Sequence, residues 1–176
     1  MAEPAVKELV SQNQHIMVRW RSFELRPEPI PTHDPNGEYL VSAWRNHVYP
    51  LAAKMKMPLK RPPIQPRSRL AHEAAKWADT QFSFEEYNLG IFRAFFEQGK
   101  DIGDIQILKG IAADLKLDEE SLHISLKNNE FTAMVLADEN EARQVGVRAV
   151  PAFVVNGKVK AAGVQTAKRL YELLSS

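Results

Sequence analysis

The chain has 176 residues, of which 44% are hydrophobic and 26% are charged. This length and composition are typical of one globular domain, or of a domain with an insertion, that can bury a core of its own. Lys and Arg number 23 against 22 Asp and Glu, so the net charge of +1 excludes a strong field for nucleic acids or anionic membranes as the organising principle. No cysteine is present, which excludes disulfides, cysteine-ligated metals and thiol nucleophiles within this chain.

Residues 1–8 are polar and acidic and lack the apolar segment of a secretory signal. No apolar run approaches the roughly 18 residues that a membrane span needs. We therefore expect a soluble cytoplasmic protein with neither nucleic-acid nor membrane partners.

The first predicted elements are a helix and a strand. Residues 4–14 have helical spacing, because Val6, Leu9 and Val10 share one face. Residues 15–23 alternate with a period of two and are rich in β-branched and aromatic side chains, which predicts a strand. Nine of the eleven prolines lie between Pro27 and Pro66, so this zone contains extended connectors.

Residues 36–146 have a helical pattern almost throughout. The sharpest helix start is at Ser83, which forms a predicted capping box with Glu86, while Phe82 and Tyr87 occupy the two positions of a hydrophobic staple. Other helix boundaries are expected at Gly99, at Asp101 or Asp104, at Asp118 and at Gly146.

The C-terminal pattern returns to β-structure. Residues 150–155 predict a short apolar strand, and Asn156–Gly157 is a strong signal for a hairpin turn before a return strand at 158–162. Residues 163–165 form a tight exit, and the chain then ends in an amphipathic helix.

Five segments of the sequence are informative when they are taken together. In chain order they are residues 15–28 (HIMVRWRSFELRPE), 69–74 (RLAHEA), 92–104 (FRAFFEQGKDIGD), 142–153 and the turn 163–165. In order and spacing these segments resemble the DsbA-like family, in its FrnE and 2-hydroxychromene-2-carboxylate isomerase branch. The resemblance implies an α/β, thioredoxin-like fold with a large all-helical insertion. Residues 1–30 and 147–176 would form the thioredoxin-like domain, and residues 31–146 the insertion.

The chain also departs from that family. In the family, a first strand and a Cys-x-x-Cys motif, or a single Cys or Ser, precede the first helix, and neither lies within this sequence. The activity that the resemblance implies, thiol–disulfide exchange, requires a thiolate. We therefore expect an incomplete fold, with its first strand missing, that has no catalytic residue and is redox-inactive. Two alternatives stay open: a non-catalytic module that binds a peptide or glutathione, or a chain whose true start lies upstream and includes Cys-x-x-Cys.

The resemblance leaves the binding half of a site, at Val150, Pro151, Gly163 and Gln165. It implies a cis bond between Val150 and Pro151, which leaves the Val150 backbone free to pair with an extended peptide or with glutathione. It also places Gly163 and Gln165 where related enzymes bind the γ-glutamyl end of glutathione. The residues alone suggest simpler interpretations, namely a trans proline at the start of an edge strand and a plain turn before a helix.

Apart from glutathione as a ligand, we expect no cofactor, because the five histidines lack the spacing typical of metal ligands. The densest basic run, residues 54–61, is interpreted as a solvated helix end, with a polyanion contact as the alternative. A missing central strand would leave two unpaired strand edges. Pairing across a two-fold axis would cover both, so we expect a homodimer.

Overall fold

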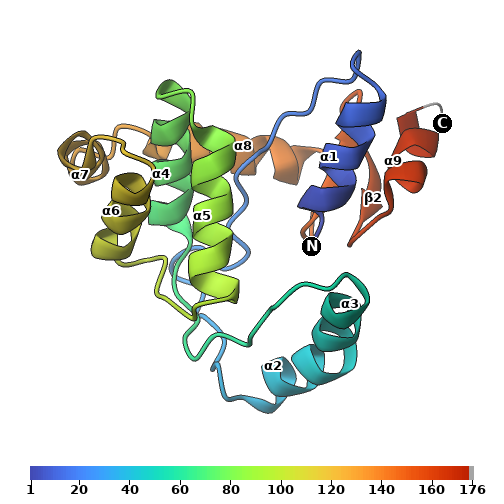
Figure 1. Ribbon diagram of the computed structural model, residues 1–176, viewed down its shortest axis with the longest axis horizontal. Helices are drawn as coiled ribbons and strands as arrows, with labels where there is room; N and C mark the ends of the chain where they lie inside the picture. The colour runs from blue at the N-terminus through green and yellow to red at the C-terminus, as the bar shows by residue number, and fades with distance from the viewer. Residues whose placement is uncertain (175–176) are drawn as a thin grey trace. The chain divides into compact units, whose positions relative to one another are not determined.

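The computed structural model describes residues 1–174 and divides the chain into two compact units (Figure 1). The terminal unit consists of residues 1–25 and the chain from 137 onward, and the helical unit consists of residues 26–136. Among the described residues, no helix has both the length and the apolar character needed to cross a bilayer.

The terminal unit contains the only strands assigned within residues 1–174. Its elements are α1 (Glu3–Gln12), β1 (Ala152–Val155), β2 (Lys158–Ala162) and α9 (Ala167–Leu174). The two strands form an antiparallel hairpin in which Ala152 pairs with Ala162. Asn156 and Gly157 both have positive φ, +49° and +73°, as a two-residue turn of this kind requires. The predicted hairpin is confirmed.

The core of the terminal unit lies between its two helices and one face of the hairpin. Val6 and Leu9 of α1 pack with Leu170 and Leu173 of α9, and Phe153 of β1 packs against this cluster. The spacing i, i+3 places each helical pair on one face, so the amphipathic patterns of the two chain ends form one common core.

The predicted strand at residues 15–23 is wrong. This segment is not paired with a strand in the structure. Instead, the backbone N–H groups of Ser22 and Glu24 donate to the carboxylates of Asp138 (3.0 Å) and Glu139 (3.3 Å). Period-two alternation favours extended backbone, but a strand also needs a neighbour, and here side-chain carboxylates satisfy the backbone donors.

The helical unit carries the other helices. Their bounds are α2 (Glu38–Ala43), the π-helical turn η1 (Trp44–Val48), α3 (Tyr49–Lys54), α4 (Arg69–Thr80), α5 (Phe84–Phe96), α6 (Ile105–Asp114), α7 (Glu119–Lys127) and α8 (Thr132–Gln144). Helix α8 begins in this unit and continues into the terminal unit. Pro50 lies at the start of α3, where the π-helical turn η1 passes directly into α3.

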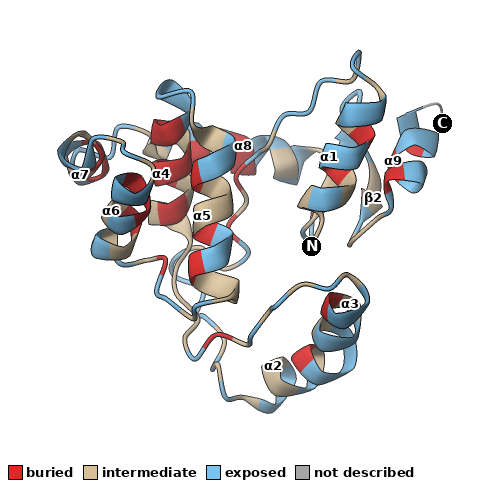
Figure 2. Cartoon of the chain, viewed as in Figure 1, coloured by how far each residue is buried: buried red, intermediate tan, exposed pale blue. Residues whose placement is uncertain are grey.

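Helices α4 to α7 pack around the larger core, and the buried residues line the inner faces of these helices (Figure 2). Ala74 and Ala78 of α4 are fully buried, which lets the neighbouring helices approach closely. Tyr87 is also fully buried, and its hydroxyl donates to the carbonyl of Leu108 at 2.7 Å. Helix α5 is thereby fixed to α6 by apolar packing and by a buried hydrogen bond.

Some predicted helix boundaries are confirmed. The carboxylates of Asp104 and Asp118 accept backbone N–H groups in the first turns of α6 and α7. Gly99 and Gly146 have positive φ, +68° and +86°, just beyond the ends of α5 and α8.

The predicted capping box and staple at Ser83 are wrong. The Ser83 side chain makes no cap hydrogen bond, and Phe82 is 98% exposed. Phe82 instead takes the left-handed position that closes the C-terminus of α4, with φ +55°, while the Ser83 N–H donates to Ala78 O at 3.0 Å. The end of α4 therefore fixes the backbone before α5 begins, and it turns the Phe82 ring away from Tyr87.

Candidate functional site

A hydrogen bond connects the residue before β1 to the residue after β2. The Gly163 N–H donates to the Pro151 carbonyl at 2.8 Å, and the Val150–Pro151 peptide bond is cis. Gly163 has φ +79°, a conformation that L side chains rarely adopt, and this allows the chain to leave β2 at this point. Two of the four site residues expected from the sequence are thus in direct contact.

The other two site residues lie at either end of this contact. The Gln165 side chain turns back, and its Nε2 donates to the carbonyls of Ala162 (3.1 Å) and Gly163 (3.3 Å). Val150 is 44% exposed at the head of the hairpin. Gln165 thus stabilises the turn, whereas Val150 is accessible to solvent.

The edge of β1 that faces away from β2 has no strand partner among residues 1–174. The strand has no charged residue, whereas β2 has lysines at positions 158 and 160. Val154 of β1 is 45% exposed, and it pairs with Val159 of β2, which is 36% exposed. An uncharged edge beside an exposed apolar face is the type of edge that accepts another strand.

Two adjacent carboxylates, which no sequence pattern predicted, hold residues 21–24 in the terminal unit. Asp138 and Glu139 are 3% and 0% exposed. Besides the bond from the Ser22 N–H, Asp138 accepts from the Arg21 guanidinium at 2.7 Å. Two neighbouring acids within a helix were the available signal, but the sequence could not show that both are buried.

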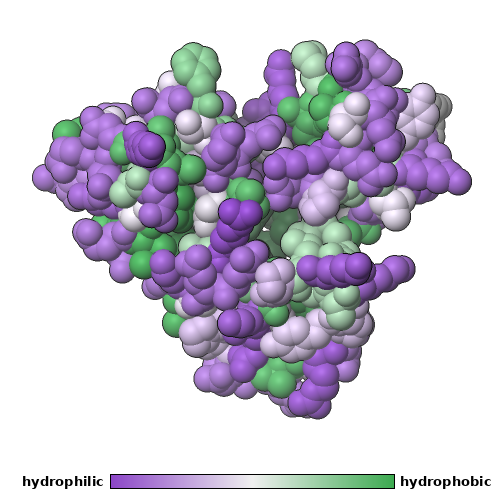
Figure 3. All heavy atoms as spheres, in the orientation of Figure 1, coloured by the Kyte–Doolittle hydropathy of each residue, from purple (hydrophilic) through white to green (hydrophobic). Residues whose placement is uncertain are grey.

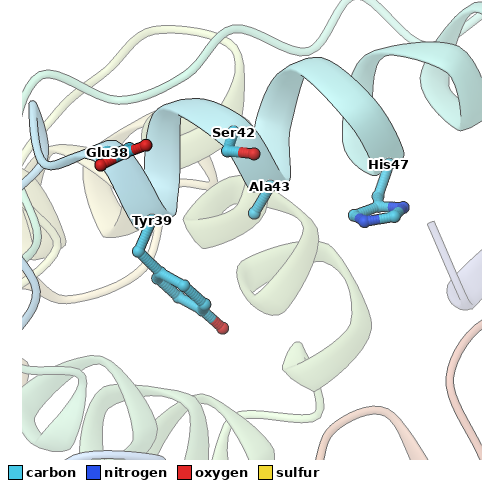
Figure 4. A pocket seen from close by; sticks show the side chains of 5 residues that line it. All are labelled: Glu38, Tyr39, Ser42, Ala43 and His47. Carbon is cyan, nitrogen blue, oxygen red and sulfur yellow. The ribbon is translucent and has the colours of Figure 1, made fainter.

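A second region of interest lies on the helical unit, where Glu38, Tyr39, Ser42, Ala43 and His47 line a hollow (Figure 4). All five come from the single helical run of α2 and η1, so they form one wall. The Ser42 hydroxyl accepts from Asn46 at 3.1 Å rather than from the imidazole of His47. The hollow therefore lacks the hydroxyl–imidazole pair that activates a serine nucleophile.

No group of three or more potential metal ligands occurs within the part of the chain that the structure describes. The Pro151 site itself contains backbone groups, apolar side chains and one amide. Such a set can position an extended ligand but offers neither a general base nor a nucleophile.

The hairpin with a proline at its head, packed with α1 and α9, has the C-terminal strand–turn–strand–helix order that the resemblance to a thioredoxin-like fold predicted. The sequence profile described as the DSBA-like thioredoxin domain matches residues 1–175. The chain belongs to this family, as the resemblance predicted.

Three comparisons support the assignment. The curated protein "Uncharacterized protein YwbO" of Bacillus subtilis is 30% identical over 84% of this chain and 76% of its own length. The "probable DsbA oxidoreductase SCO1869" of Streptomyces coelicolor has a TM-score of 0.82 at 20% identity, covering 99% of this chain and 82% of that one. A 2-hydroxychromene-2-carboxylate isomerase has a TM-score of 0.75 at 17% identity, covering 99% and 85%. At these identities the two solved structures show the fold alone, and the predicted thioredoxin-like class is confirmed.

Proposed function

We propose that this chain is a thiol-free binding member of its family, which holds an extended peptide along the free edge of β1 beside Pro151. The observation that carries the proposal is the hairpin itself. Its uncharged outer edge has no strand partner within residues 1–174, and its head is fixed by the hydrogen bond from Gly163 to Pro151.

In this proposal, the backbone of β1 supplies the affinity and the exposed valines supply the selectivity. An added strand would form main-chain hydrogen bonds with β1, and alternate side chains would contact the face that carries Val154. Val150 extends this apolar surface at the head of the strand. Peptides with β-branched residues at alternate positions fit this surface best.

Glutathione is the second candidate ligand, and the position of Gln165 argues against it. The Gln165 amide donates to two carbonyls of its own turn, so binding a γ-glutamyl group would require those bonds to break. Redox inactivity is part of the same proposal, and the absence of any residue in this chain that forms a thiolate supports it.

Calorimetry with two probes tests the binding proposal. A cysteine-free peptide of alternating threonine and valine should bind with measurable heat, and glutathione should not. Val154→Lys should weaken peptide binding by about tenfold or more, because a charge then faces the added strand. The matched control, Val159→Lys, places the same charge one strand farther away and should have a smaller effect. An absence of peptide binding, or equal losses in the two variants, would refute the proposed edge.

An insulin-reduction assay with dithiothreitol tests redox inactivity separately. The chain should leave the rate of precipitation at the level of the protein-free blank. Any catalysed turnover would contradict a thiol-free function, whatever the outcome of the peptide titration.

A further inference from the structure

The turn between α4 and α5 presents a fully exposed aromatic ring. Phe82 is 98% exposed and has φ +55°. Three other positions just beyond helix ends have the same left-handed backbone, and there the chain uses Lys56, Lys116 and Asn129, whose polar side chains suit water. The left-handed backbone does not stabilise a phenylalanine, and the Phe82 ring buries no apolar surface in the isolated chain. Its ring is available to a partner.

Acidic side chains surround this ring in the sequence of the turn. Asp79 precedes it, and Glu85 and Glu86 follow it in the first turn of α5. All three are exposed, and no ion pair within the described chain engages them. Figure 3 shows hydrophobic surface over this turn. An aromatic face close to carboxylates binds a lysine or an arginine, because the ring quadrupole and the carboxylates both attract a cation. We call Phe82 with these three acids the acidic knob.

The same unit contains a surface of opposite charge. Residues 39–61, which we call the basic arm, contain five Lys and Arg and no Asp or Glu. Subtracting this +5 from the net charge of +1 leaves −4 on the rest of the chain. Arg61 is bonded to the carbonyl of Pro35. The other four basic residues are Arg45, Lys54, Lys56 and Lys60. All four are exposed, and none forms an ion pair among residues 1–174.

The basic arm also offers apolar contact for an incoming ring. Tyr49 is 44% exposed, and Pro50 beside it is exposed. Both lie between Arg45 and Lys54 along the helical run, so an aromatic side chain that reaches these cations also meets non-polar surface.

We propose that the acidic knob of one copy of this chain docks on the basic arm of a second copy. The knob and the arm lie at different ends of the helical unit, at the α4–α5 turn and around α3, so one unit cannot pair them with each other (Figure 1). The contact is head-to-tail, and each added copy leaves one knob and one arm free. It differs from the two-fold strand pairing expected from the sequence, and it does not depend on peptide binding at β1.

Sedimentation velocity of the full chain tests this contact. At about 100 µM protein and about 50 mM salt, the weight-average mass should exceed the 19.9 kDa of one chain, and it should fall toward that value at about 500 mM salt. Phe82→Gly should weaken self-association about tenfold or more without harming the fold, because glycine suits the left-handed backbone. Arg45→Glu with Lys54→Glu, and separately Glu85→Lys with Glu86→Lys, should each give monomers.

Mixing the two charge-reversed variants provides the decisive measurement. In each variant alone, either the knob or the arm is altered, so no copy can offer an intact pair of surfaces. In the mixture, the unaltered knob of the Arg45→Glu/Lys54→Glu variant meets the unaltered arm of the Glu85→Lys/Glu86→Lys variant, and a mixed complex should form. Lys127→Glu with Lys168→Glu is the matched control for charge, and Met17→Ser, at a residue 86% exposed, is the control for an exposed apolar side chain. Both should associate like the parent chain.

Four outcomes would overturn the proposal. The parent chain could be monomeric at low salt, or the mixture could fail to associate. Alternatively, self-association could be abolished by Val154→Lys but not by Phe82→Gly, which would assign the contact to strand pairing at β1. Binding of a single-stranded oligothymidylate to the arm of a monomeric chain would make a nucleic acid the occupant instead.

Discussion

Replacing Asp138 by alanine removes the acceptor that fixes residues 21 and 22 to α8. Asp138 is 3% exposed, and its carboxylate accepts from the Ser22 N–H at 3.0 Å and from Arg21 at 2.7 Å. Ser22 is itself only 6% exposed, so its N–H would lose its partner in a place that water does not readily reach.

The expected loss of stability follows from these two bonds. A hydrogen bond to a buried charged acceptor is worth about 1.5–3 kcal/mol. The Arg21 side chain is 47% exposed, so solvent screens its ion pair, which adds about 0.2–1 kcal/mol. Asp138→Ala should therefore lower the free energy of unfolding by about 2–4 kcal/mol, or the melting temperature by roughly 5–15 °C for a chain of this size.

Urea unfolding followed by circular dichroism measures this change, and Glu141→Ala is the matched control. Glu141 pairs with the same Arg21 at 3.2 Å but is 61% exposed, so its removal should cost less than about 0.5 kcal/mol. Asp138→Asn keeps one acceptor and should fall between the two. A loss below about 1 kcal/mol for Asp138→Ala, or equal losses for Asp138→Ala and Glu141→Ala, would refute the reasoning that a buried carboxylate replaces strand pairing here.

Three further predictions concern Phe82, a pair of glycines and Tyr87. Phe82→Gly should raise the free energy of unfolding by about 0.5–1 kcal/mol in urea melts, since glycine relieves the φ of +55° and no buried contact is lost; a decrease would show that the ring packs. Gly163→Ala should destabilise by about 1 kcal/mol because its φ is +79°, whereas Gly110→Ala, within α6 and in open space, should stabilise by about 0.5–1 kcal/mol; the same sign for both would contradict this. Burial raises the pKa of the Tyr87 hydroxyl, so its contribution to stability is complete below the ordinary tyrosine pKa of about 10 and is lost as the pH rises above it. Tyr87→Phe should flatten that alkaline loss in unfolding measured between about pH 9 and 11, and an unchanged slope would argue against it.

Much of the fold could be predicted from local signals in the sequence. Asn156–Gly157 determines its hairpin because both residues accept positive φ, and Asp104 and Asp118 determine helix starts because a short carboxylate reaches the first backbone N–H groups. These signals act within a few residues of the element they specify. The same is true of the contact between Pro151 and Gly163, which lie at the two ends of one short hairpin.

The wrong predictions all concern competition between elements. Ser83 and Phe82 match the sequence patterns of a capping box and a hydrophobic staple. However, Phe82 takes the left-handed backbone conformation that ends α4, and its ring is therefore exposed to solvent. Residues 15–23 match a strand, but the carboxylates of α8 satisfy their backbone instead of a neighbouring strand. Neither competitor is visible within the segment concerned.

The sequence by itself determined that this chain contains no thiol, since that depends only on which residues are present. It also determined the hairpin and several helix boundaries, because these depend on neighbouring residues. Only the tertiary structure decided that two acids more than a hundred positions away hold the extended segment, and that Phe82 is an exposed ring. The physical reason is that the burial of a side chain and the hydrogen-bond partners of a backbone depend on segments that folding brings together. A local sequence pattern does not specify which distant segment will pack against it.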